Sequence, residues 1–126
     1  MKYPALSHLI GGRRVPGSGS SLPVISPVDG ATLSQVPLGD ASVVAQAAEA
    51  AAAAQREWAA RTMRQRSAVC YRYRQLLSEH QDELAALIHE ENGKTVAEGA
   101  AEIVRAIEVT EFACSLPQMV VGAVME

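Results

Sequence analysis

The sequence is short of the residues and motifs on which most metal, nucleotide and membrane sites depend. Its 126 residues include two cysteines and three histidines, and no Cys–His spacing of a metal site joins them. No apolar run reaches the ~18 residues needed to span a bilayer. The N-terminus also lacks the apolar core and small-residue cleavage site of a secretory signal. These absences predict a cytoplasmic protein with no metal-binding residue.

The charge balance argues against large anionic partners. The net charge is −3, which disfavours both nucleic acid and an anionic membrane surface. A composition of 48% hydrophobic and 20% charged residues is that of a folded globular chain. Cys70 and Cys114 stand 44 residues apart and are expected to be free thiols in the cytosol.

Glycine is concentrated near the N-terminus without forming a nucleotide-binding loop. Residues 11–20, GGRRVPGSGS, contain neither G-x-G-x-x-G nor the Walker pattern with its Lys-Ser/Thr. The stretch is interpreted as a hairpin turn and a flexible loop. No cofactor-binding residue is therefore expected here.

The first forty residues hold five of the six prolines and six of the nine glycines. Gly11-Gly12 predicts a tight turn between two short strands, and SPVDG at 26–30 predicts a second turn between residues 22–25 and 33–36. This region is therefore expected to consist of β-hairpin and loop.

Helical patterns follow. Asp40 is a candidate N-cap for an Ala-rich helix over 41–60, and Trp58 is expected to close that helix into a core pocket. Thr62 with Gln65 forms a capping box that predicts a helix over 63–79. The expected apolar stripe of this second helix comprises Val69, Tyr73, Leu76 and Leu77.

Two more helices are expected after residue 80. One spans 81–91 and stops at Asn92-Gly93, since both residues tolerate a left-handed conformation. The next spans 96–115 behind a Thr95/Glu98 capping box and ends at Pro117. Its expected buried positions are Ile103, Ile107, Thr110 and Cys114.

No residue qualifies as a catalytic nucleophile. Cys114 falls on the apolar stripe and near a helix C-terminus, where the helix dipole disfavours a thiolate. Arg105 lies opposite Ile103 and beside Glu102 and Glu108. Taken by itself, Arg105 is an exposed arginine in ion pairs worth a few tenths of a kcal/mol.

The order of these motifs resembles one family. ENGKT followed by EIVRAIEVTEFACSLPQMVVG resembles the aldehyde dehydrogenases, and most closely their methylmalonate-semialdehyde branch. HLIGGRRV is similar to that family's opening strand and turn. ISPVDGATLSQVP resembles its Asn-Pro-Ala-Thr segment, with Ser26 in place of the usual asparagine.

The resemblance implies an α/β fold overall, to which this chain contributes an N-terminal β-hairpin followed by about four helices. It implies strands and loops over 1–39 and, over 40–126, the helical part of a truncated cofactor-binding domain. It also implies a homo-oligomeric, NAD-dependent, CoA-acylating enzyme that converts methylmalonate or malonate semialdehyde to propionyl- or acetyl-CoA.

The family's catalytic cysteine, general base and dinucleotide-binding units map to none of these residues. The chain alone is therefore expected to be a catalytically incomplete fragment that binds neither NAD nor CoA. The resemblance implies that Arg105 binds the substrate carboxylate, and that Lys94 has a structural role at helix carbonyls.

Two alternatives stay open. The chain could belong to another branch, such as a succinate-semialdehyde or betaine-aldehyde enzyme, although Arg105 and EFACSLPQMVVG argue against it. It could instead be a standalone helical module that assembles through its tail, residues 119–124. The isolated chain is expected to self-associate through exposed apolar helix faces.

Overall fold

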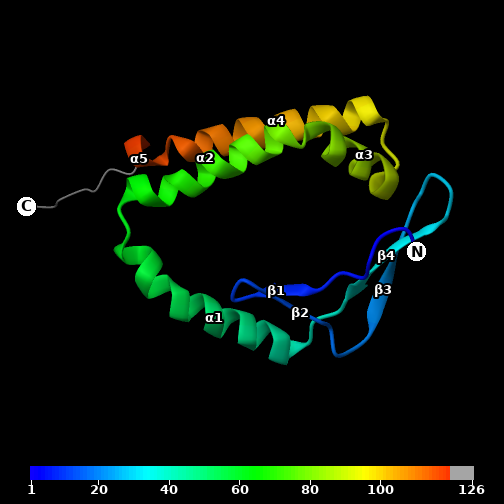
Figure 1. Cartoon of the computed structure of the whole chain (residues 1–126), viewed down its shortest axis with the longest axis horizontal. Helices are drawn as coiled ribbons and strands as arrows, with labels where there is room; N and C mark the ends of the chain where they lie inside the picture. The colour runs from blue at the N-terminus through cyan, green and yellow to red at the C-terminus, as the bar shows by residue number, and fades with distance from the viewer. Residues whose placement is uncertain (120–126) are drawn as a thin grey trace, which may run out of the picture. The chain divides into compact units, whose positions relative to one another are not determined.

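The computed structural model describes residues 1–119, which fall into two compact units. The first unit contains residues 1–59 together with 90–93, and the second contains residues 60–89 together with the chain from residue 94. Figure 1 labels the helices and strands of both units.

The first unit begins with two antiparallel hairpins, as the turn residues predict. Strands β1 (His8–Ile10) and β2 (Arg13–Val15) are joined by Gly11 and Gly12, whose φ angles are 57° and 75°. Only glycine adopts such values readily, so this pair fixes the turn.

The second hairpin consists of β3 (Ser21–Ile25) and β4 (Thr32–Pro37), with Ser21 opposite Pro37. Its turn includes Gly30 at φ 73°, and the buried Ser26 hydroxyl accepts a bond from the Val28 N–H. Leu33 and Ser34 of β4 are buried.

Helix α1 (Ala41–Ala60) follows the predicted cap. The Asp40 carboxylate accepts bonds from the backbone N–H groups of Ser42 and Val43, at 2.9 and 3.0 Å. No residue of α1 is buried, and Trp58 is 37% exposed, so the prediction that Trp58 enters a core was wrong. Alanine makes a helix without needing a core, because its advantage is intrinsic propensity.

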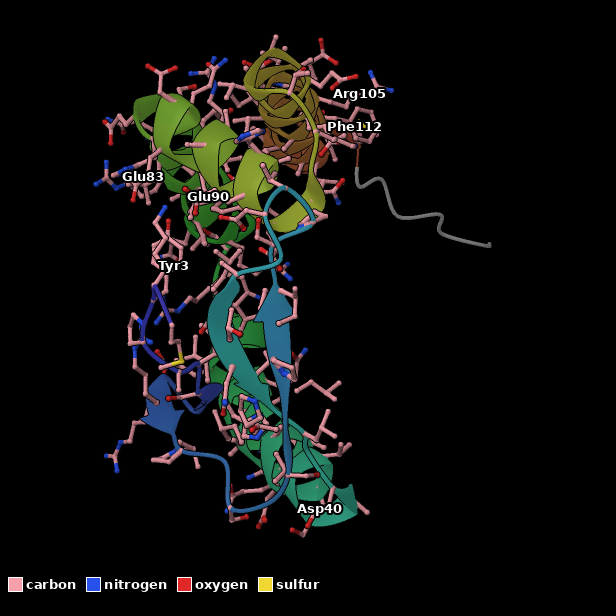
Figure 2. All side chains as sticks on the ribbon, turned by 90° about the vertical axis from the view of Figure 1, so that its right-hand side faces the viewer. Tyr3, Asp40, Glu83, Glu90, Arg105 and Phe112 are labelled. Carbon is pink, nitrogen blue, oxygen red and sulfur yellow. The ribbon has the colours of Figure 1, made fainter. Side chains whose placement is uncertain are left out.

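The N-terminal residues of the first unit are tied to Glu90. The Tyr3 hydroxyl donates to one oxygen of that carboxylate at 2.9 Å, and Lys2 forms an ion pair with the other. Figure 2 shows Tyr3 and Glu90 directed toward each other. These bonds join residues that lie 87 and 88 positions apart in sequence.

The second unit is a helical hairpin. Helix α2 (Met63–Glu79) leads through α3 (Gln81–Asn92) to α4 (Val96–Cys114), and α5 (Leu116–Met119) ends the described chain. Figure 1 shows α4 lying antiparallel along α2, with α5 returning to the beginning of α2. The buried apolar residues of this unit are Leu77, Ala85, Ile103 and Cys114.

Helices α3 and α4 approach closely at a glycine. A Cβ on Gly99 would lie 2.8 Å from the carbonyl oxygen of Ala85, which is 1% exposed. Between the two helices, Gly93 takes φ 77° and ends α3, as predicted.

Some predicted burial in the second unit was wrong. Val69 and Tyr73 of the predicted α2 stripe are exposed, whereas Leu77 is buried as predicted and Leu76 is half-buried. Ile107 is half-buried, whereas Ile103, Thr110 and Cys114 are buried as predicted. Pro117 lies inside α5, so α4 ends three residues before it.

Over residues 1–119, no helix has the length and apolar character needed to cross a membrane. The predicted interaction tail at 119–124 lies, apart from Met119, outside the described residues.

Candidate functional site: the outward face of α4

Helix α4 is held at its start by a complete capping box. The Thr95 hydroxyl accepts a bond from the Glu98 N–H, and the Glu98 carboxylate accepts one from the Thr95 N–H at 2.9 Å. That backbone bond and a second bond from the Thr95 hydroxyl lower the pKa of Glu98. The helix therefore begins at a defined residue, which fixes where its later side chains point.

The two sides of α4 have different roles in the structure. Gly99, Ile103, Thr110 and Cys114 form the buried side. Arg105, Val109 and Phe112, spaced by four and three residues, share the opposite side. We call these three residues the outward face of α4. Figure 2 shows Arg105 and Phe112 projecting to the same side of the helix.

Arg105 is the charged group of this face. Its side chain is 78% exposed, and Nη1 donates to Glu108 at 2.9 Å. An exposed pair at this spacing is weak and exchanges readily with another partner. A guanidinium beside apolar Val109 and Phe112, which is 62% exposed, can accept a carboxylate in a bidentate fork.

Lys94 takes a different partner from the one predicted. Its ammonium group pairs with the Glu102 carboxylate of α4 rather than with helix carbonyls. Of the two neighbouring carboxylates on this side of the helix, Glu102 thus pairs with Lys94 and Glu108 pairs with Arg105.

Cys114 is a packing residue, as predicted. Its side chain is buried on α4, and burial is the main cause that raises the pKa of its thiol. A thiol with a raised pKa is not the activated thiolate that a catalytic cysteine needs. Within residues 1–119, no cluster of three His, Cys, Asp or Glu side chains could hold a metal ion.

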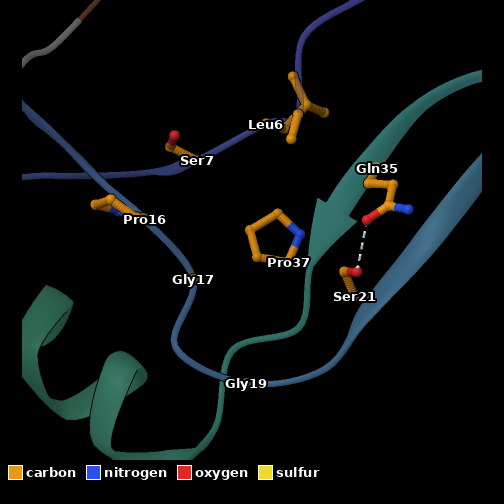
Figure 3. A pocket seen from close by; sticks show the side chains of 9 residues that line it. Leu6, Ser7, Pro16, Gly17, Gly19, Ser21, Gln35 and Pro37 are labelled. Atoms are coloured by element: carbon orange, nitrogen blue, oxygen red, sulfur yellow. Dashed lines mark hydrogen bonds between the residues drawn. The ribbon is translucent and has the colours of Figure 1, made fainter. Parts of the chain in front are cut away.

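A pocket in the first unit was not predicted from the sequence. It is lined by residues 5–7, by Pro16, Gly17 and Gly19, and by residues of β3 and β4. On one wall the Ser21 hydroxyl donates to Gln35 at 3.0 Å (Figure 3). A Cβ on Gly17 would lie 2.3 Å from Pro37 Cβ, so this glycine permits close packing of the chain. The lining carries no charged side chain, which leaves it without a group for acid–base chemistry.

The architecture and the sequence agree with one family. The model of the aldehyde dehydrogenase family matches residues 15–126. This chain belongs to the aldehyde dehydrogenase family, and its two hairpins followed by helices match the N-terminal region of that fold.

Two relatives illustrate which members of the family this chain is similar to. A malonate-semialdehyde dehydrogenase from Pseudomonas aeruginosa is 38% identical over 117 residues, which cover 93% of this chain and 24% of the relative. A solved structure from Sinorhizobium meliloti 1021, assigned to the methylmalonate-semialdehyde dehydrogenases and complexed with NAD, aligns at a TM-score of 0.91 and 36% identity. That alignment covers all of this chain and 26% of the solved one.

Similarity in this region does not by itself fix the substrate. An NAD-dependent benzaldehyde dehydrogenase from Corynebacterium glutamicum aligns at a TM-score of 0.89 and 35% identity, over 95% of this chain and 27% of its own. The chain spans about a quarter of the length of the curated relatives it matches. A choice of substrate therefore has to come from particular residues.

Proposed function

We propose that this chain forms the N-terminal region of an NAD-dependent, CoA-acylating malonate- or methylmalonate-semialdehyde dehydrogenase, in which Arg105 binds the carboxylate end of the substrate. The observation that carries this proposal is the exposed guanidinium on the outward face of α4. The similarity to malonate-semialdehyde dehydrogenases over 93% of the chain supports it.

The chemistry of the substrate suits Arg105. A semialdehyde with a terminal carboxylate offers two oxygens that match the planar guanidinium fork. Exchanging the exposed Glu108 carboxylate for a substrate carboxylate costs little, because the Arg105–Glu108 pair is in contact with water. An aldehyde with no carboxylate would gain nothing from Arg105.

Within residues 1–119, none of the four long helices has a start that suits the phosphates of NAD. A dinucleotide phosphate requires open backbone N–H groups at a helix N-terminus. Helices α1, α2 and α4 each begin at a side-chain cap, and Asp40 and Glu98 place carboxylates at two of these caps. Helix α3 carries Asp82 and Glu83 in its first turn, where their charge opposes a phosphate. We therefore propose that NAD and CoA bind elsewhere in the enzyme, and that this chain alone is catalytically incomplete.

The proposed absence of an NAD site in this chain can be tested by a binding measurement. Calorimetry on the isolated chain should show no binding of NAD at micromolar affinity. Measured binding at that level would contradict the assignment of the cofactor site to other parts of the enzyme.

We also propose that this chain associates with itself when it is isolated. Val44 of α1, Val69 and Tyr73 of α2, and Phe112 of α4 are all exposed. Apolar area in water costs about 25 cal/mol per Å², which favours association. Sedimentation should therefore show oligomers at high concentration, and a stable monomer would oppose the idea.

The role of Arg105 is tested by kinetics of a full-length enzyme that carries this chain as its N-terminal region. Arg105→Ala should cost about 2–4 kcal/mol in kcat/KM for malonate semialdehyde, and nearly nothing for propanal. Arg105→Lys should recover only part of the loss, since an ammonium keeps the charge without the fork. Equal losses on both aldehydes would remove the carboxylate role.

A second candidate function is that of another branch of the same family. The similarity to a benzaldehyde dehydrogenase favours this alternative. That alternative predicts that Arg105→Ala leaves the preference among aldehydes unchanged. The same kinetic comparison therefore separates the two functions.

A further inference from the structure

Cys70 on α2 and Cys114 on α4 lie opposite each other across the interface that holds the second unit together. The register of the two helices is set by Arg74, whose Nε and Nη2 both donate to Glu111 Oε1, at 2.9 and 2.7 Å. The helices run antiparallel (Figure 1). Cys70 lies four residues before Arg74, and Cys114 lies three residues after Glu111. Both cysteines are therefore displaced from the Arg74–Glu111 pair in the same direction. At 1.5 Å per residue these steps are about 6 and 4.5 Å, which brings the two cysteines to nearly the same level.

Both side chains also belong to the sides of the helices that pack together. Cys70 follows the buried Ser67 by three residues and precedes the buried Leu77 by seven, a spacing that keeps all three on one side of α2. Cys70 is half-buried, and Cys114 is 7% exposed. The negative charge that Cys70 would carry as a thiolate also raises the pKa of Cys114, after the larger contribution of burial.

A small molecule can reach this position. A pocket lined by Tyr71, Arg74, Glu111, Cys114, Ser115 and Gln118 opens beside the Cys114 side chain. The half-buried Cys70 is itself in part accessible to solvent. Neither thiol is engaged in a disulfide.

We propose that Cys70 and Cys114 are a redox modification site, at which a peroxide converts the two thiols to an intramolecular disulfide. The Cys70 thiolate attacks one oxygen of hydrogen peroxide and the O–O bond breaks, which leaves a sulfenic acid on Cys70 and releases water after protonation. The Cys114 sulfur then attacks the Cys70 sulfur, and the S–O bond breaks. The departing hydroxide takes the Cys114 proton and leaves as a second water. Two electrons pass from the thiols to the peroxide.

The disulfide would link α2 to the C-terminal end of α4, whereas the contact between Gly99 and Ala85 lies near the N-terminal end of α4. It closes a loop between positions 44 residues apart, which restricts the unfolded chain and stabilises the folded one. It requires the two Cα atoms to come within about 7 Å of each other. Reduction by a dithiol restores the two free thiols.

The test is oxidation of the purified chain with hydrogen peroxide, followed by thiol titration and non-reducing peptide mass spectrometry. The expected result is a loss of two hydrogens per chain, a fall from two free thiols to none, and a linked peptide that contains both cysteines. The melting temperature should rise and should return to its starting value with dithiothreitol.

Cys70→Ser and Cys114→Ala are the matched controls, and circular dichroism checks that each is folded. Neither variant should lose two hydrogens or gain melting temperature on oxidation. Three results would overturn the proposal: two thiols that survive in the oxidised wild type, a sulfinic acid on Cys70 beside a free Cys114, or links found only between chains.

Discussion

Helices α1 and α4 have nearly the same length, 20 and 19 residues, but they are stabilised by different means. Helix α1 contains eleven alanines, begins at an Asp40 cap and has no buried residue. Helix α4 begins at a full capping box and has four buried residues facing its neighbours. Intrinsic propensity and a cap account for α1, whereas packing adds a second source of stability to α4.

The packing of α4 makes it the better support for the candidate site. A side chain that binds a substrate must be held in one position by its support. The buried side of α4 provides that support, because Ile103 and Cys114 pack in the second unit and Gly99 fits against Ala85. Arg105 on the other side is then placed by a helix that cannot easily shift or rotate.

Removing a buried side chain of α4 should give the largest difference in stability between substitutions in α4 and in α1. Ile103→Ala should lower the free energy of unfolding by about 2–4 kcal/mol, because it leaves a cavity in the core. Val44→Ala in α1, where valine is exposed, should change it by less than about 0.5 kcal/mol. Urea unfolding followed by circular dichroism measures both, and similar losses would mean that α1 is packed as α4 is.

A methyl group added at the close approach of α3 and α4 should have the next largest effect. Gly99→Ala places a Cβ 2.8 Å from the Ala85 carbonyl oxygen, so the helices must separate at a cost of about 1–3 kcal/mol. Helix propensity favours alanine over glycine by about 1 kcal/mol and offsets part of that cost.

The matched control for Gly99→Ala is Gly12→Ala in the first hairpin. There φ is 75° and no atom would lie within 4 Å of the new Cβ, so the cost comes from the backbone alone. If Gly99→Ala proved stabilising, the close contact between α3 and α4 would be refuted.

The same contrast shows which features a sequence can predict. Asp40, the Thr62/Gln65 and Thr95/Glu98 boxes and the stop at Gly93 were predicted because each depends only on residues a few positions apart. Burial was predicted less well, because the neighbouring element decides which side of a helix packs. Of the stripe predicted for α2, Leu77 is buried, but Val69 and Tyr73 are exposed, and the polar Ser67 is buried without having been predicted.

The sequence predicted which residue is the candidate site but not all of the ion pairs around it. Arg105 and its closeness to Glu108 follow from helical spacing, and the structure shows that bond. The Lys94–Glu102 pair was missed because it crosses the turn before α4. The carboxylate role of Arg105, the division of the chain near residue 40 and a cytoplasmic location stay predictions.

Acid should affect α1 more than α4, because both caps use a carboxylate of lowered pKa but only α4 also has buried residues. Bonds from the Ser42 hydroxyl and from the Val43 N–H lower the pKa of Asp40 below its ordinary value. A lowered folded-state pKa gives stability that is present above the unfolded pKa of about 3.9 and is lost as pH falls through the folded value.

Circular dichroism at 222 nm measures this pH dependence. Helical signal should fall between about pH 4 and pH 2 in the wild type, and less steeply in Asp40→Asn, which has no carboxylate to titrate at the α1 cap. The two curves should coincide above pH 5, because asparagine also caps helices well. Identical curves over the whole range would show that Asp40 does not control α1.

A small change in stability is expected at Arg105 itself. Arg105→Ala removes one exposed ion pair and should alter the free energy of unfolding by less than about 1 kcal/mol. Glu108→Gln should have an effect of the same size, because it removes the same pair from the other side. A loss above 2 kcal/mol at either position would mean that Arg105 supports the fold.

The central claim is that the buried side of α4 provides structure while its outward face selects the substrate. The most direct measurement is the ratio of kcat/KM for malonate semialdehyde to that for propanal, in a full-length enzyme carrying this chain, for Arg105→Ala and for Ile103→Val. The account predicts a fall of about 30- to 1000-fold for Arg105→Ala, corresponding to about 2–4 kcal/mol. It predicts an unchanged ratio for Ile103→Val, which should lower only stability, by about 1 kcal/mol. An unchanged ratio for Arg105→Ala, or an equal fall in both variants, would contradict it.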